Sequence, residues 1–189
     1  MLDNINIPIS AEFNFQIEKK DQKSPSQSNL YARRGKIQTP HGCIQTPAFI
    51  FCATKGYLKN ITAKQLKECK SQIILSNTYH LEIFPGNKKI QSMGGLQKMT
   101  SWNGPMLTDS GGYQIFAMGH GSVSSEIKGK KNKYKPTLSE INEKGANFRS
   151  YLDNSKKSLT PESSIQIQHN LGADLILVFD ECTPFNVSK

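Results

Sequence analysis

Residues 106–116 read MLTDSGGYQIF, an apolar run that stops on an acid and continues into a serine and two glycines. A short apolar run bounded by turn residues is typical of a buried strand, and we predict one over residues 105–108. In α/β proteins, ligands bind in loops that follow the carboxyl ends of the strands. An acid at a strand end, followed by a turn almost without side chains, therefore predicts a binding loop that starts at Asp109.

Strands and helices alternate on both sides of this stretch. Further apolar runs predict strands at 48–53, 71–75 and 174–179, and helices are predicted at 61–70, 88–93 and from 160 to 172. Thr62 and Gln65 can form a capping box, and Thr160 followed by Pro161 is a helix start. The alternation predicts an α/β fold with a parallel sheet, either an open doubly wound sheet or a closed eight-stranded barrel. No G-x-G-x-x-G follows the first strand, which weighs against the dinucleotide-binding form.

Two antiparallel elements are predicted beside the parallel sheet. Phe13, Phe15 and Ile17 alternate with polar residues, which indicates a peripheral strand, and the polar run 18–29 is a connector. Residues 31–49 predict a hairpin with TPHG as its turn, and 146–159 predict another. We therefore divide the chain into a peripheral strand and connector, 1–30, and a barrel-type domain, 31–189.

Composition excludes several classes of protein. The 189 residues are 36% apolar, which suits one globular domain with a core, and we find neither a membrane-length apolar run nor a secretory signal. A cytoplasmic protein is predicted. The four cysteines are scattered, which favours free thiols over a metal site. The net charge of +9 is equally compatible with a nucleic-acid partner and with a basic protein that has none. The lysine-rich loop 128–135 is likewise compatible with contact to RNA phosphates and with simple solvation.

Two acids follow predicted strands. Asp109 ends the third core strand and Asp180 the fourth, and neighbouring parallel strands lie ~5 Å apart. We predict that both carboxylates face one pocket, although an aspartate at either position can also simply cap the next helix.

The residues after Asp109 suit a flat ligand. Gly111 and Gly112 lack a Cβ, so a planar ring can approach the backbone, where amides such as that of Ser110 can donate hydrogen bonds. Tyr113 can stack on a base, unless it packs into the core. A carboxylate accepts from ring N–H and amino groups such as those of guanine.

Five motifs occur together: NTYHL (77–81), TDSGGYQ (108–114), TPE (160–162), LGAD (171–174) and FDECTP (179–184). In this combination the chain resembles the tRNA-guanine transglycosylases, also called queuine tRNA-ribosyltransferases, from Ala32 to its end. The resemblance implies a (β/α)8 barrel whose one end is capped by an N-terminal sheet. It also implies exchange of a guanine in tRNA, at the anticodon wobble position, for a 7-deazaguanine such as preQ1.

The resemblance assigns roles to nine residues. Asp109 would be the general acid/base, Tyr113 would stack on the base, and Asp180 would accept hydrogen bonds from it, with Cys182 nearby. Asn77 and Gln114 would steady the carboxylates and the ribose. Ser110, Gly111 and Gly112 would complete the base-binding loop.

The sequence also departs from the family. A (β/α)8 barrel needs ~250 residues, and about four core strands are visible here. We therefore predict the N-terminal half of a barrel. The attacking aspartate, the Gly-rich segment of the base pocket and the zinc cluster of three cysteines and one histidine lie downstream in the family and match no residue here. Residues 51–54 read FCAT, where family members commonly have Pro-Val-Gly-Thr.

Unpaired strands at the edges of a half-barrel predict a second polypeptide, a homodimer or poor folding. We accordingly expect no activity from the chain alone. The alternatives are a non-catalytic remnant that binds RNA or a partner chain, and an unrelated barrel enzyme that acts on a sugar or phosphate.

Overall fold

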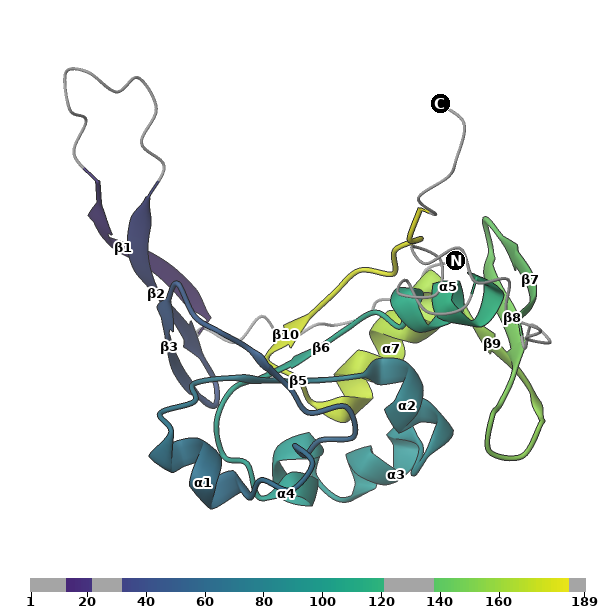
Figure 1. Cartoon of the computed structure of the whole chain (residues 1–189), viewed down its shortest axis with the longest axis horizontal. Coiled ribbons are helices and arrows are strands. Elements are labelled where there is room, and N and C mark those ends of the chain that lie inside the picture. Colours follow the sequence, from purple (N-terminus) through teal and green to yellow (C-terminus); the bar gives the residue numbers. More distant parts are fainter. Residues whose placement is uncertain (1–12, 22–31, 121–137, 184–189) are drawn as a thin grey trace.

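The computed structural model describes residues 13–21, 32–120 and 138–183. It shows a mixed α/β fold with three sheets, of which two are antiparallel and one is parallel. The antiparallel sheets lie at opposite ends of the molecule, and the parallel sheet lies between them (Figure 1). The lysine-rich loop 128–135 lies outside the described residues.

The N-terminal sheet has the order β1–β2–β3. Its strands are β1 (Asn14–Lys20), β2 (Arg33–Thr39) and β3 (Gly42–Thr46). The Thr39 hydroxyl donates to the Gly42 carbonyl at 2.8 Å, and Gly42 has a φ of 134°, a backbone conformation that favours glycine. The predicted strand and TPHG hairpin are therefore confirmed.

A buried carboxylate ties this hairpin to the parallel sheet. Asp174 accepts from the ring Nδ1 of His41 at 2.8 Å and from the backbone N–H of Met106 at 2.9 Å. The Gln97 amide donates to the same carboxylate at 3.3 Å. Because Asp174 immediately precedes β10 (Leu175–Ile176) and Met106 starts β6 (Met106–Thr108), this network joins the hairpin turn to the amino ends of two neighbouring parallel strands.

The parallel sheet has the order β10–β6–β5–β4. Its strands are β4 (Phe51–Cys52), β5 (Ile74–Ser76), β6 (Met106–Thr108) and β10 (Leu175–Ile176). All four predicted core strands are present, but the first and last are much shorter than 48–53 and 174–179. Just after β10, the side chain of Gln168 bonds both backbone groups of Leu177 in place of a neighbouring strand. Its Oε1 accepts from the Leu177 N–H at 3.0 Å, and its amide donates to the Leu177 carbonyl at 2.8 Å.

Six helices are described, and the predicted capping residues start two of them. The helices are α1 (Ala63–Glu68), α2 (Thr78–Ile83), α3 (Asn87–Ser92), α4 (Leu96–Thr100), α5 (Gly112–His120) and α7 (Pro161–Leu171). Thr62 and Gln65 form the predicted capping box, and Thr160 caps α7. Helices α2, α4 and α5 were not predicted. Helix α2 lies in the NTYHL motif, where no helix was expected, and α4 and α5 start at glycines that indicated a helix end or a binding turn.

The third sheet has the order β7–β8–β9 and confirms the second hairpin. Its strands are β7 (Leu138–Asn142), which was not predicted, β8 (Gly145–Arg149) and β9 (Lys156–Leu159). The core lies between the parallel sheet and the helices, where α3 packs against α7. Its fully buried members include Ala53, Leu81, Ile90, Leu96, Met106 and Leu171. In the described ranges, no helix combines the length and apolarity needed to cross a bilayer.

Candidate functional site

The carboxylate of Asp109 is held at the ends of two neighbouring strands. It follows β6 and accepts from the Thr78 backbone N–H at 2.7 Å, the Asn77 amide at 2.5 Å and the Gln114 amide at 3.2 Å. Asn77 directly follows β5, and Gln114 lies in the first turns of α5. The structure thus brings three predicted site residues together and fixes the orientation of a half-buried carboxylate.

The second acid, Asp180, is joined to the same loop by a buried serine. The Ser110 hydroxyl donates to Asp180 at 2.6 Å and accepts from the backbone N–H of Gly112 at 3.0 Å. Because Ser110 is the neighbour of Asp109, the loops after β6 and β10 are bonded to each other. The thiol of Cys182 lies 3.8 Å from the other Asp180 oxygen. Burial, followed by the charge of Asp180, raises the pKa of this thiol.

The two glycines allow close approaches within the chain. A Cβ on Gly112 would overlap the carbonyl and carboxylate oxygens of Asp180. Gly111 has a φ of 89°, and a Cβ there would lie 2.9 Å from the Leu159 side chain. The need for glycine is therefore explained first by packing within the chain, against the loop after β10 at Gly112 and against β9 at Gly111. Approach of a planar ligand to these glycines stays a prediction.

Tyr113 is not a core residue. It lies in the first turn of α5 with 47% of its surface exposed, and its ring is 6.4 Å from that of Phe116. An exposed ring beside the glycine turn has a free face, as stacking requires. The stacking role itself stays a prediction.

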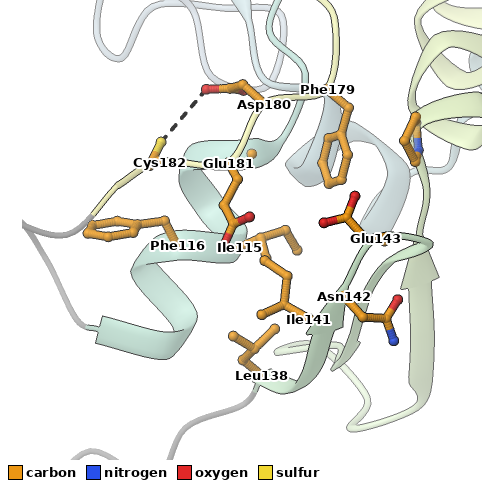
Figure 2. Close-up of a pocket in the computed structure, with 13 residues that line it drawn as sticks. Ile115, Phe116, Leu138, Ile141, Asn142, Glu143, Phe179, Asp180, Glu181 and Cys182 are labelled. Carbon is orange, nitrogen blue, oxygen red and sulfur yellow. Dashed lines mark hydrogen bonds between the residues drawn. The ribbon is translucent and has the colours of Figure 1, made fainter. Parts of the chain in front are cut away.

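A cavity of about 360 Å³ lies between α5, the β7–β8 hairpin and the segment after β10. Figure 2 shows Ile115, Ile141 and Phe179 around this space, while the carboxylate of Asp180 points toward Cys182 at its edge. The cavity is lined by Gly112, Ile115, Phe116, Leu138, Ile141, Asn142, Glu143, Gly145, Pro161, Phe179, Asp180, Glu181 and Cys182. Asp109 is not among these residues, so a pocket shared by both acids stays a prediction.

Three residues near Asp109 were not singled out from the sequence. Thr78 donates its backbone N–H to that carboxylate, although it lies within the NTYHL motif. His80, in the same motif, is partly buried; burial and then the charge of Lys55 lower the pKa of its imidazole, and Asp109 opposes them. Cys52, from the divergent FCAT stretch, has its thiol 3.8 Å from the Asn77 carbonyl oxygen.

No group of three or more His, Cys, Asp or Glu side chains in the described ranges is arranged to hold a metal ion. The site is therefore built from two acids, two amides, a serine bridge and a glycine turn. Together with the parallel sheet, these features define an α/β protein with a candidate ligand site at the carboxyl ends of its strands.

Comparison with known proteins identifies the family. The chain belongs to the queuine tRNA-ribosyltransferase family, whose profile matches residues 27–189. It is 43% identical to the queuine tRNA-ribosyltransferase of Roseiflexus over 174 residues, which are 91% of this chain and 42% of that protein. The Chlamydia caviae enzyme of the same name is 46% identical over 156 residues, 82% of this chain and 41% of that protein.

A third relative, from Deinococcus radiodurans, covers 96% of this chain and 40% of its own length at 41% identity. The chain thus spans about two fifths of the length of the curated relatives it matches.

Proposed function

We propose that this chain carries the base-recognition part of a site that exchanges a guanine in tRNA for a 7-deazaguanine such as preQ1 or queuine. The observation that carries the proposal is the orientation of Asp109 by Asn77, Thr78 and Gln114. Membership of the queuine tRNA-ribosyltransferase family supports it. The exchange at the wobble position and the choice of incoming base belong to the proposal.

The chemistry requires two displacements at the ribose C1′ atom. A carboxylate attacks C1′, and guanine departs with the electron pair of the glycosidic bond and takes up a proton. The incoming base then attacks C1′, releases the carboxylate and loses its N–H proton. We assign that proton transfer to Asp109, recognition of the base to Asp180, with Cys182 and Ser110 beside it, and stacking to Tyr113. Gly111 and Gly112 complete this loop.

The attacking carboxylate is proposed to come from the part of the family's length that this chain does not match. We propose that the four parallel strands belong to a (β/α)8 barrel, that the N-terminal sheet caps it, and that residues 31–189 form its domain. Within the described residues, β4 and β10 each pair with one neighbour. Apolar residues exposed beside these edges, among them Phe49 and Val178 at 73% and 77%, support further strands from a second polypeptide or a second copy.

Guanine exchange into tRNA tests the proposal. Unmodified tRNA and radiolabelled guanine are incubated with the chain, alone and together with a polypeptide that supplies the rest of a relative's length. We expect label in tRNA from the mixture and none from the chain alone.

The mixture with the Asp109→Asn variant should lose nearly all guanine exchange, because asparagine cannot take up the proton. Asp21→Asn, a change at an exposed acid after β1, is the control and should retain the exchange. Undiminished exchange by Asp109→Asn would remove that residue from the mechanism. Tight tRNA binding without exchange from any mixture would instead support the non-catalytic binding protein.

A further inference from the structure

The exposed face of the β8–β9 hairpin places two positive charges opposite each other. Arg149 is the direct cross-strand partner of Lys156, and both side chains are exposed. Like charges at directly opposed positions of an antiparallel pair destabilise the sheet. A pair that costs stability in the free protein is explained when an anion binds between the two side chains.

A hollow beside this pair carries further hydrogen-bond donors. It has a volume of about 390 Å³ and is lined by Asn147, Phe148, Lys156, Lys157 and Ser158. Lys157 pairs with Phe148 on the opposite side of the hairpin, whereas the ammonium group of Lys156 and the hydroxyl of Ser158 lie on the face of Arg149. Phosphate oxygens accept from each of these groups.

In the described ranges, no acid forms an ion pair with the cations of this face. The ion pairs found in the described ranges involve Arg34, His41 and Lys64, and none involves β8 or β9. Glu140 on β7 accepts from the Asn142 and Asn147 amides.

At the hairpin tip, Asp153 accepts from the Ser155 hydroxyl at 2.7 Å. Hydrogen bonds from Ser155 and Ser150, with a smaller contribution from the charge of Lys157, lower the pKa of Asp153 to about 2. Among the described residues, the Arg149 guanidinium donates one hydrogen bond, at 3.1 Å to the Asn154 carbonyl, so these residues use only a minority of its five N–H donors.

We propose that this face, formed by Arg149, Lys156 and Ser158, binds phosphates of an RNA backbone. The proposal rests on the proposed function, since it names a contact surface for the tRNA. A polynucleotide is the favoured anion because each phosphate that a cation neutralises releases condensed counterions, a gain that a single free phosphate does not supply. The net charge of +9 is compatible with the same class of partner.

The test is the salt dependence of tRNA affinity. The affinity of the chain for unmodified tRNA is measured by fluorescence anisotropy between 50 and 200 mM KCl, for the wild type and the Arg149→Gln/Lys156→Gln variant. We expect weaker binding, and a slope of log K against log salt that is shallower by about 0.7–0.9 for each lost phosphate contact. Arg149→Lys/Lys156→Arg, which keeps both charges, should restore the affinity.

Lys88→Gln/Lys89→Gln is the matched control. It removes the same charge from exposed positions on α3, away from the hairpin, and should leave the slope nearly unchanged. Equal losses of tRNA affinity and of salt dependence in the two double variants would overturn the proposal, because they would show a general effect of net charge. Competition by poly-glutamate as effective as that by tRNA at equal charge would also overturn it, in favour of an acidic protein partner.

Failure of this surface and failure of the proposed activity give different results. If exchange occurs but the slope is the same in wild type and variant, the surface is wrong and the activity stands. If the slope changes but no mixture exchanges guanine, the surface stands and the proposed activity falls.

Discussion

At the scale of single residues, the chemistry of the candidate site depends on how its acids are oriented. Asp109, at the end of β6, receives two donors from the residues after β5 and one from α5, and Asp180 receives the hydroxyl of Ser110. The residue types were predictable, since acids after buried strands and a Gly-Gly turn are visible in the sequence. The bond between Ser110 and Asp180 was not, because it joins residues 70 positions apart.

His80 makes the stability of the fold depend on pH. Burial lowers its pKa below the ordinary value of 6.5, with Lys55 acting in the same direction. As the pH falls through 6.5, the unfolded chain therefore takes up this proton before the folded chain does, and the free energy of unfolding decreases. Urea unfolding at several pH values between 7.5 and 5 should show this decrease, and His80→Gln should reduce it. Parallel pH profiles for the two proteins would contradict the assignment.

Ser110 should stabilise the loop after β10. Ser110→Ala removes a buried hydroxyl that bonds Asp180 and leaves the Gly112 N–H without its acceptor, and such losses cost about 1–3 kcal/mol. Ser92→Ala, at an exposed hydroxyl on α3, should change the free energy of unfolding by less than about 0.5 kcal/mol. Chemical denaturation measures both, and equal effects would show that the Ser110 bridge adds no stability.

At the scale of elements, the sequence predicts which helices and strands exist better than it predicts how long they are. The four core strands follow from short apolar runs, and α1 and α7 follow from their caps. Residues 175–179 are all apolar, yet the strand ladder ends at Ile176 because Gln168 on α7 bonds Leu177. Periodicity cannot show which polar side chain replaces a strand neighbour. Likewise, α5 was hidden because its first residues are those of the glycine turn.

Gln168 should therefore matter more than its position on a helix suggests. It is fully buried and also accepts from the Thr108 hydroxyl at 3.0 Å, so it joins α7 to β6 and to the segment after β10. Gln168→Leu leaves several buried polar groups without partners and should lower the free energy of unfolding by about 2–4 kcal/mol. Gln166→Leu, at an exposed position on the same helix, is the control and should have little effect. If urea unfolding shows comparable decreases in the free energy of unfolding for both variants, this role of Gln168 is contradicted.

At the scale of the whole molecule, the parallel sheet holds the candidate site and the flanking sheets hold other surfaces. Its β4 and β10 edges carry exposed apolar residues, and the β8–β9 hairpin carries exposed positive charge. The partial match to the family and the pairing of the third and fourth core strands were both predicted from the sequence, but the four strands described do not show a closed barrel. The barrel and its closure by another polypeptide or copy therefore stay predictions.

We propose above all that the site at the ends of β6 and β10 recognises a 7-deazaguanine base. Titration of the ¹⁵N-labelled chain with preQ1, followed by amide chemical shifts, measures this directly, even for millimolar affinity. We expect chemical-shift changes centred on Ser110, Gly111 and Gly112. Asp180→Asn should bind preQ1 at least tenfold more weakly, and Glu181→Gln should bind it as the wild type does. Shifts confined to other regions, or equal affinity in the wild type and Asp180→Asn, would contradict it.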